Sequence, residues 1–474
     1  MQTTFKTLTS QVLKKITPTP EEYHKVEVLS RKLEQKITEA CQQIGVAAVV
    51  RVEGSVAKDT WLRENPDIDV FMRLSPSVSR KNLGDIGLKI AKTAAKDATE
   101  IIERFAEHPY LEIIIDDFRV DIVPCYDAKP GEWQSATDRT PYHTDYIKQH
   151  LTPEMRGEVR LLKQFMQGVG VYGAEIKIGG FSGYLCELLI LTYGSFIETV
   201  QAFSQYSKRV VIDPENLFEG RKEELAFLFP EPLVIIDPVD KARNVASAVQ
   251  TEKLYNFIGA TRAFLQKPSE AFFYPPPKPM LPTEELKRTL DSRGSTLLFL
   301  SIDGVKAVPD VLWGQLYRSR RSLRKLLELN DYKVLRDAVW SNEKTLSVFV
   351  FELEQQVLPN IKKHQGPPLE RPRECVSFLA KYSSNSQVIC GPYIENGKWI
   401  VEVPRKNVDA AALLREKLVD GGKNVGVSEL IAKAFKEDFS VFAGNEIAEI
   451  YLKDEKFAVF LTGFLSGKPF WLES

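Results

Sequence analysis

Residues 46–74 read VAAVVRVEGSVAKDTWLRENPDIDVFMRL, and this stretch decides which fold the sequence predicts. Its apolar runs and its glycine predict, in chain order, a strand, a turn, a short helix and a second strand: Val46–Val52, Gly54-Ser55, Val56–Leu62 and Ile68–Leu74. Side chains alternate between the two faces of a strand. Asp67 and Asp69 are therefore expected on one face, with Ile68 and Val70 on the other.

The flanking segments extend this core. They predict two helices and then two strands that form a hairpin turned at Asp117: Glu21–Ile44, Asn82–Phe105, Leu111–Asp116 and Phe118–Pro124. Together these segments predict a mixed α/β domain that ends near Leu151.

Beyond Leu151 the pattern becomes helical and then mixed again. Glu154–Val200 looks helical apart from a glycine-rich break at Gly168–Gly183, and Pro275–Pro279 predicts a linker. After the linker we expect three strands, Thr296–Ile302, Thr345–Leu353 and Trp399–Val403, and three helices, Pro309–Glu328, Ala410–Val419 and Ser428–Phe435. The sequence thus predicts an α+β multidomain protein with domains at residues 1–151, 152–270 and 283–474.

The composition is that of a globular protein. Of the 474 residues, 43% are hydrophobic and 27% are charged, which excludes disordered and low-complexity classes. At roughly 150 residues per domain, the length allows about three domains. The 63 basic and 64 acidic residues give a formal net charge of −1, so a polyanionic partner requires a local basic patch.

Two features bear on the compartment. Five widely spaced cysteines, with no Cys-x-x-Cys pair, favour a reducing cytoplasm over a disulfide framework or a zinc site. The most apolar stretch, Tyr184–Ile197, is interrupted by Glu187 and is too short to span a bilayer, and the polar N-terminus has no signal-peptide core. A soluble cytoplasmic protein with no membrane partner is expected.

Paired carboxylates on one strand face are ligands that hard cations such as Mg²⁺ prefer. An isolated Asp-x-Asp is most often a solvated strand end, but here Gly54 and Ser55 precede it, where backbone N–H groups at a helix start can bind a phosphate. A third carboxylate, Asp121, lies on an alternating strand and would neighbour the pair in a sheet. Taken alone, Asp121 is better explained as an edge-strand charge that prevents aggregation.

The order of Gly-Ser, a short helix, Asp-x-Asp and a later strand Asp resembles the nucleotidyltransferase fold of the DNA polymerase β superfamily. Further strings, in the same order along the chain, resemble the archaeal (class I) CCA-adding enzymes: Asp138–His143, Tyr172–Glu175, Gly180–Glu187, Asp237–Asp240 with Arg243–Ala246, and Gly391–Tyr393 with Trp399. The resemblance spans essentially the whole chain. It implies a polymerase β-like head, a helical central domain and an α/β C-terminal region that binds RNA.

The resemblance also implies roles for single residues. Asp67, Asp69 and Asp121 match the catalytic carboxylates that bind two Mg²⁺ ions, with Asp121 nearest the attacking 3′-hydroxyl. The expected nucleotide-binding residues are Gly54, Ser55, Lys58, Thr140, His143, Lys163, Tyr172, Ser182 and Arg243. Arg243 matches the arginine that helps to hold the incoming base. Lys58 stands where arginine is common, which keeps the charge but loses the two-pronged contact.

Simpler explanations stay open for several of these residues. Taken alone, His143 is a surface histidine after a proline turn, Tyr172 and Tyr184 are packing aromatics, and Arg243 is an ion-pair partner. The string Gly168–Gly173 also satisfies the dinucleotide-binding pattern, but it follows a predicted helix instead of a strand, which excludes a Rossmann site.

A basic helical window marks the expected RNA-binding face. Its basic residues, flanked by Trp313 and Tyr317, suit a surface that follows phosphates: Arg318, Arg320, Arg321, Arg324 and Lys325. A solvated helix face explains the same residues equally well. Further basic residues that could extend the surface along an acceptor stem are Arg371, Arg373, Lys398, Arg405 and Lys406.

The resemblance predicts an enzyme that adds C, C and A in turn to the 3′ end of tRNA, from CTP and ATP, with two Mg²⁺ ions, no nucleic-acid template and release of pyrophosphate. It also implies a homodimer. Two alternatives stay open: a poly(A) polymerase of the same superfamily, and a catalytically silent tRNA-binding protein on the same scaffold.

Overall fold

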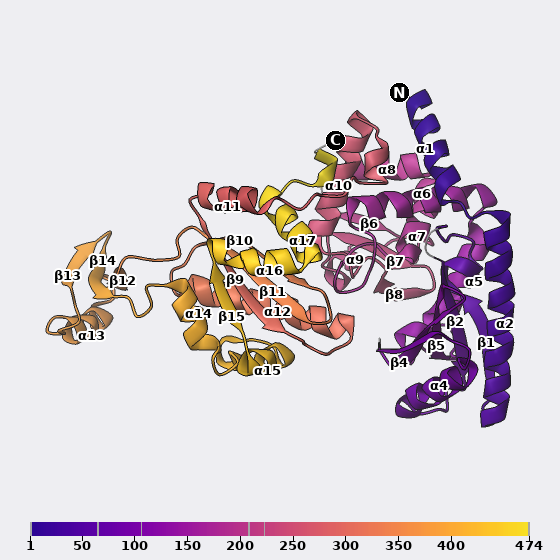
Figure 1. The fold of residues 1–474 in the computed structure, drawn as a ribbon, viewed down its shortest axis with the longest axis horizontal. Helices are drawn as coiled ribbons and strands as arrows, with labels where there is room; N and C mark the ends of the chain where they lie inside the picture. Colours follow the sequence, from indigo (N-terminus) through magenta and orange to yellow (C-terminus); the bar gives the residue numbers. More distant parts are fainter. Residues whose placement is uncertain (1, 64–65, 106, 207–208, 222, 473–474) are drawn as a thin grey trace. The chain divides into compact units, whose positions relative to one another are not determined.

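The computed structural model describes residues 2–63, 66–105, 107–206, 209–221 and 223–472, and Figure 1 shows its fold. The outer ends of the first and third predicted domains, Met1 and Ser474, lie outside these residues. The chain forms two compact units, residues 1–277 together with 468–474, and residues 278–467. The predicted proline linker, Pro275–Pro279, lies at the division between the two units.

The N-terminal part of the first unit is built on a five-stranded sheet with the order β1-β2-β5-β4-β3. Its elements are α2 Pro20–Ile44, β1 Ala48–Glu53, α3 Gly54–Ala57, β2 Asp67–Leu74, α4 Arg80–Ala94, β3 Glu100–Phe105, β4 Pro109–Ile115 and β5 Phe118–Tyr126. β2 and β5 are parallel and all other neighbours are antiparallel. The expected mixed sheet is confirmed. So is the β4–β5 hairpin, whose turn residues Asp116 and Asp117 both have positive φ.

Helices α2 and α4 cover one face of this sheet. Ile68 and Val70 of β2 lie in one apolar core with Leu33 of α2 and Ile90 of α4. Strand alternation sends the side chains of Asp67 and Asp69 to the opposite face. The buried face therefore fixes which side of the sheet carries the carboxylates.

Two predicted elements are wrong. Asn82–Phe105 is not a single helix, because Glu100–Phe105 pairs along its whole length with β4, and this tertiary pairing outweighs helix propensity. The predicted helix Val56–Leu62 is also wrong. The short helix starts earlier and spans Gly54–Ala57, and Asp59, just beyond its end, has a φ of 54°.

The rest of the first unit is mainly helical, as expected. Its elements are α1 Gln2–Ile16, α5 Thr140–His150, α6 Pro153–Val169, α7 Gly183–Tyr193, α8 Phe196–Ser204, β6 Val210–Ile212, α9 Glu224–Leu228, β7 Leu233–Asp237, β8 Asp240–Asn244 and α10 Thr251–Gln266. The glycine-rich break in the predicted helical stretch is the connection between α6 and α7. Both helices have apolar residues in one large core, which also takes in α8 and α10.

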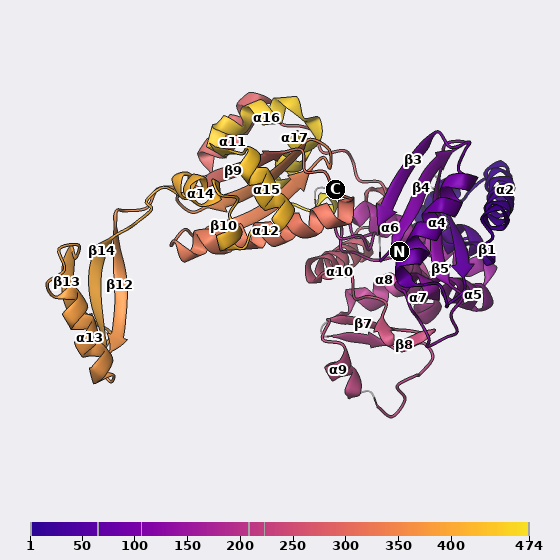
Figure 2. The same ribbon diagram turned by 90° about the horizontal axis from the view of Figure 1, so that it is seen from below.

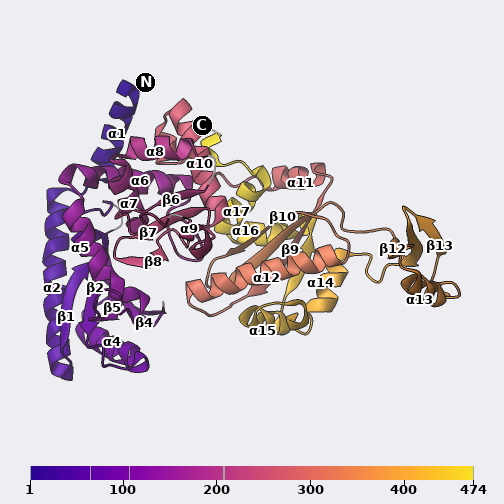
Figure 3. The same cartoon turned by 180° about the vertical axis from the view of Figure 1, so that it is seen from behind.

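The second unit contains a four-stranded antiparallel sheet, β10-β11-β9-β15, with helices on both faces. Its elements are α11 Thr283–Ser292, β9 Thr296–Asp303, α12 Pro309–Leu329, β10 Val334–Ser341, β11 Leu346–Leu353, α14 Ala410–Leu418, α15 Glu429–Glu437, β15 Ser440–Ala443, α16 Ala448–Lys453 and α17 Glu455–Ser466. Figure 3 shows α12 lying along the sheet, where it shares a core with α14 and α15. Helices α11, α16 and α17 pack on the other face.

A smaller sheet, β12-β14-β13, is inserted between β11 and α14. It consists of β12 Ile361–Pro368, β13 Cys390–Glu395 and β14 Lys398–Pro404, and α13 Pro372–Tyr382 lies against it (Figure 2). Over the described residues of both units, no helix combines the length and the apolarity that crossing a membrane requires.

Candidate active site

A row of four acidic side chains crosses the first sheet at the carboxylate pair. Asp69 of β2 pairs with Glu53 of β1 on one side and with Asp121 of β5 on the other. Asp121 in turn pairs with Glu112 of β4. Paired residues in neighbouring strands share a face. The structure therefore brings Asp69 and Asp121 side by side, with Asp67 at the start of the same strand.

The two outer acids of this row have arginine partners. Glu53 has a fully buried side chain and lies 2.5 Å from Nε of Arg51. Glu112 is bound by Arg104 at 2.7 Å and by Arg119 at 3.0 Å. Asp121 has only a longer arginine contact, with Nη2 of Arg119 3.5 Å from its Oδ2, and its Oδ1 is buried without a hydrogen-bond partner. The inner pair is thus the part of the row with unused binding capacity.

Burial and mutual repulsion raise the pKa values of the inner acids. Burial is the main cause at Asp69, and the charges of Asp121 and Asp67 add to it, so that its pKa rises to about 7. Burial raises the pKa of Asp121 to about 6, although Arg119 opposes the rise. A bound cation would favour the ionised forms of both carboxylates.

The donor set fits Mg²⁺. In the described part of the chain, no group of three or more His, Cys, Asp or Glu side chains is arranged to hold a metal ion by itself. Mg²⁺ does not need such a group, because one or two carboxylates usually hold it together with substrate phosphates. Asp69 and Asp121, neighbours on β2 and β5, with the unpartnered Oδ1 of Asp121, offer one or two such carboxylates.

Gly54 brings the backbone against this site. Its φ is +67°, and a Cβ at this position would lie 1.9 Å from Oδ2 of Asp69, so glycine alone fits. The same approach places the start of α3, which includes Ser55, beside the carboxylates.

The two lysines expected at the triphosphate meet at a buried glutamate. Glu187 of α7 accepts hydrogen bonds from Nζ of Lys58 at 2.5 Å and from Oγ1 of Thr60 at 2.6 Å. Lys163 Nζ lies 3.6 Å from Oε1 of Glu187 and donates to the carbonyl of Thr60 at 3.0 Å. Although burial opposes it, Lys58 and Lys163 hold the pKa of Glu187 below its ordinary value. Sequence reasoning did not assign Glu187 to the site, although its signal was present, since it is the acid that interrupts Tyr184–Ile197.

Two further predicted residues, Ser182 and Tyr172, lie at the start of α7. Ser182 caps this helix by accepting the N–H of Leu185 at 3.1 Å. A Cβ on Gly183 would lie 3.2 Å from the hydroxyl of Tyr172 and 3.4 Å from Nζ of Lys163. Tyr172 lies in the connection that precedes α7, in a bridge with Phe181, and not on a packed helix.

His143, Tyr184 and Arg243 form a separate cluster, and Thr140 lies at the start of α5, which also carries His143. The rings of His143 and Tyr184 stack with centroids 4.0 Å apart. Only 12% of the His143 side chain is exposed, so the explanation of a surface histidine is wrong. Arg243 does form an ion pair, with Asp237 at 2.8 Å, yet 35% of its side chain remains exposed.

Comparisons with known proteins decide the family. Residues 33–143 match the nucleotidyltransferase domain, residues 157–274 the second domain of tRNA nucleotidyltransferases, and residues 293–444 the C-terminal domain of CCA-adding enzymes. The CCA-adding enzyme of Methanosarcina barkeri is 39% identical over 455 residues, which cover 95% of this chain and 96% of that protein. The chain belongs to the CCA-adding enzyme family.

Other CCA-adding enzymes are similar over comparable lengths. The enzyme of Methanothermobacter thermautotrophicus is 35% identical over 465 residues, covering 96% of this chain and 97% of that protein. The enzyme of Halobacterium salinarum (strain R1) is 34% identical over 446 residues, covering 94% and 95%. The resemblance inferred from the sequence is confirmed, and the chain is a nucleotidyltransferase that adds CCA to tRNA.

In this member of the CCA-adding family, α12 divides the predicted RNA-binding residues into two groups. Arg320 and Arg324 form ion pairs with Asp337 of β10 at 3.0 and 2.5 Å. The others, Arg318, Arg321 and Lys325, are exposed at helical spacing. We call these three residues the α12 stripe. The α12 stripe is thus the part of the window that is exposed and not held by Asp337.

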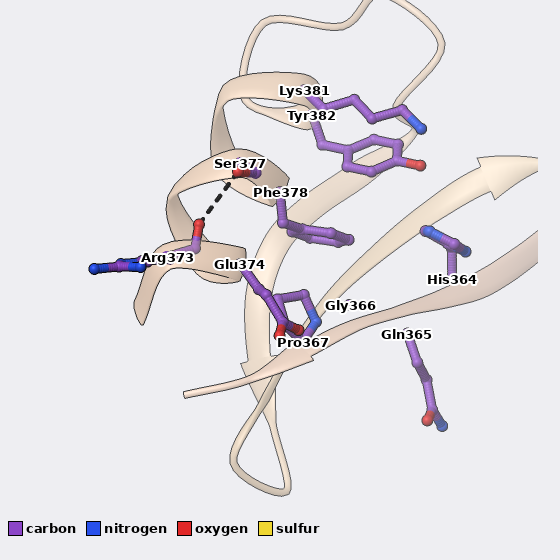
Figure 4. A pocket seen from close by; sticks show the side chains of 10 residues that line it. All are labelled: His364, Gln365, Gly366, Pro367, Arg373, Glu374, Ser377, Phe378, Lys381 and Tyr382. Atoms are coloured by element: carbon purple, nitrogen blue, oxygen red, sulfur yellow. Dashed lines mark hydrogen bonds between the residues drawn. The ribbon is translucent and has the colours of Figure 1, made fainter. Parts of the chain in front are cut away.

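A second surface of the same unit combines aromatic rings with basic groups. His364 of β12 lies 6.0 Å from Phe378 and 5.4 Å from Tyr382 of α13, measured between ring centroids. Figure 4 shows these rings between strand and helix, with His364 on β12 and with Phe378 and Tyr382 on α13. They line an open pocket of about 540 Å³, together with Arg373 and Lys381. We call it the α13 pocket. Stacked aromatic rings beside cations are typical of surfaces that bind single-stranded bases.

Proposed function

We propose that this chain adds C, C and A in turn to the 3′ end of tRNA with Asp67, Asp69 and Asp121 as the ligands of two Mg²⁺ ions. The observation that carries the assignment is the Asp69–Asp121 pair on the parallel strands β2 and β5, with the backbone of Gly54 against it. When bound, the ions would offset charge on the triphosphate and hold the attacking and leaving oxygens in line.

The residues of the chain supply the remaining steps. Asp121 has a buried, unpartnered oxygen and accepts the proton of the tRNA 3′-hydroxyl. That hydroxyl oxygen then forms a bond to the α-phosphorus, the bond to the bridging oxygen breaks, and pyrophosphate leaves. Lys58, Lys163 and Tyr172 bind the triphosphate with the N-terminus of α7, at which Ser182 lies.

The direct test uses two carboxylate variants. Asp69→Asn and Asp121→Ala are expected to abolish incorporation of labelled CTP into tRNA that lacks CCA, while tRNA binding persists. Binding persists because neither side chain lies on the α12 stripe or at the α13 pocket. Turnover retained in either variant would refute the assignment of the site.

Product length separates the two alternative functions. A poly(A) polymerase would extend without stopping, whereas a CCA-adding enzyme terminates after C, C and A. A silent tRNA-binding protein would incorporate nothing, and the presence of all three carboxylates with Gly54 speaks against it. We would incubate tRNAs that end at the discriminator base, at C and at CC with CTP and ATP, separately and together.

The assignment of partners is also a proposal. The exposure of Arg318, Arg321 and Lys325, and the aromatic lining of the α13 pocket, support contacts of the second unit with tRNA. All five cysteines are free thiols, which supports a cytoplasmic location. The family resemblance further supports a homodimer, which sedimentation equilibrium would test.

A further inference from the structure

Asp237, the last residue of β7, lies where side chains from three other elements meet. It is fully buried, and both of its carboxylate oxygens are used. Oδ2 accepts hydrogen bonds from Nε2 of His143 at 2.9 Å and from Nη1 of Arg243 at 2.8 Å. Oδ1 accepts from the hydroxyl of Tyr184 at 3.2 Å and from the backbone N–H of Val239 at 3.1 Å.

We propose that Asp237 is a positioning residue for nucleotide selection, which holds His143 and Arg243 in the orientation in which they contact the sugar and base of CTP and ATP. The inference rests on the proposed function, because it requires a nucleotide at this site. It adds a residue that does not itself touch the nucleotide.

The contacts restrict both side chains strongly. A single oxygen, Oδ2, is shared by His143 of α5 and Arg243 of β8, so these two groups are held at a fixed separation. Tyr184 of α7 also lies against the face of the His143 ring, at an interplanar angle of 25°. The imidazole is thus fixed at one edge and on one face, and a preorganised group loses less entropy when a ligand binds.

The same contacts leave most N–H donors of the Arg243 guanidinium available to a ligand. Within the described residues, the Arg243 guanidinium has no hydrogen bond besides that from Nη1 to Asp237, and 35% of its side chain is exposed. Arginine carries five N–H donors in a planar fork, so several remain for a base edge. A purely structural ion pair would not require this exposure.

The histidine is held in one tautomer. Burial lowers the pKa of His143 in spite of the neighbouring Asp237, which favours the neutral ring, and its contact with a carboxylate oxygen requires Nε2 to donate. In a neutral imidazole that donates from Nε2, the other nitrogen, Nδ1, is an acceptor. His143 therefore recognises a ligand group that donates a hydrogen bond, and the ribose hydroxyls of a nucleotide belong to that class.

The test compares Asp237→Asn with a matched control. Asp237→Asn keeps the shape but removes the negative charge and leaves only one acceptor oxygen, so it cannot hold His143 and Arg243 as the carboxylate does. We expect KM for CTP and ATP to rise on the order of 10²-fold, with a smaller change in kcat and unchanged tRNA binding. Asp237→Glu keeps the charge and should recover part of the loss. Glu352→Gln removes another buried, arginine-bound carboxylate, which lies in the second unit, and should leave both KM values unchanged.

Two results would overturn the proposal: KM values of Asp237→Asn close to those of the wild type, or an equal rise in Glu352→Gln. If Asp237→Asn does not fold, ¹⁵N-histidine NMR of the wild-type protein decides, since the chain has only five histidines. We expect His143 to be neutral with its proton on Nε2, and a proton on Nδ1 refutes the arrangement. A wild type that incorporates neither nucleotide would refute the proposed function instead.

Discussion

Replacement of Gly54 by alanine is predicted to lower the rate of nucleotide addition on the order of 10²-fold while the protein remains folded. Gly54 has a φ of +67°, and an L-residue in this region costs about 1–2 kcal/mol of unfolding free energy. The larger effect is local. The new Cβ would lie 1.9 Å from Oδ2 and 2.9 Å from Cγ of Asp69, so the carboxylate must rotate away from its place beside Asp121. A displaced catalytic group costs on the order of 10²-fold in rate.

Gly45 provides the matched control for backbone strain. It ends α2 with a φ of +75°, and a Cβ there would meet nothing within 4 Å. Gly45→Ala should therefore lose about the same 1–2 kcal/mol but keep its activity. We would measure urea unfolding and the initial rate of CTP incorporation for both variants. Wild-type activity in Gly54→Ala, or equal inactivity in Gly45→Ala, would show that contact with Asp69 is not the cause.

Three further predictions concern other parts of the chain. Glu187→Gln should raise KM for both nucleotides and lower the unfolding free energy by about 3 kcal/mol, because it removes the buried charge that pairs with Lys58 and Lys163. Steady-state kinetics would measure the KM values and urea unfolding the free energy. Unchanged KM values would contradict the predicted effect on nucleotide binding. Alanine at Arg318, Arg321 and Lys325 together should weaken tRNA binding and lower the slope of log Kd against log salt concentration by about 2–3. Arg320→Ala should leave that slope unchanged, since Arg320 is paired with Asp337. Equal slopes for the triple variant and the wild type would refute a phosphate-binding role. Hydrogen bonds from Arg293 and Arg336 lower the pKa of Glu352 from 4.5 to about 2, although burial opposes them. The contribution of Glu352 to the unfolding free energy is therefore fully present above about pH 4.5 and is lost as the pH falls towards 2. The difference in unfolding free energy between wild type and Glu352→Gln should narrow across that pH range, and a constant difference would contradict the prediction.

Local pattern was sufficient for much of the fold. The alternation of Asp67 and Asp69 with Ile68 and Val70 predicted which face carries the carboxylates, and the apolar cores that α2 and α4 form on the other face confirm it. The helical spacing of Glu21–Ile44 likewise predicted α2. Such patterns are local, because the periods of strands and helices are set by the backbone.

The elements that were predicted wrongly show what a local sequence pattern cannot predict. Glu100–Phe105 carries residues compatible with a helix, and only its pairing with β4 makes it a strand. In the same way, the basic window on α12 was predicted to form one face, but Asp337 of a neighbouring strand forms ion pairs with both Arg320 and Arg324. A sequence window contains no information on a partner that lies on another element.

The sequence by itself determined the chemistry of this protein: the carboxylates, the Gly-Ser turn and the family strings that identify a CCA-adding enzyme. Only the tertiary structure decided how that chemistry is arranged. The register that sets Asp69 beside Asp121, and the buried carboxylates of Glu187 and Asp237 that hold Lys58 and His143, join residues far apart in the chain. Backbone pairing of β2 with β5 sets the first arrangement, and the second forms because buried charges from different elements must find partners on leaving water.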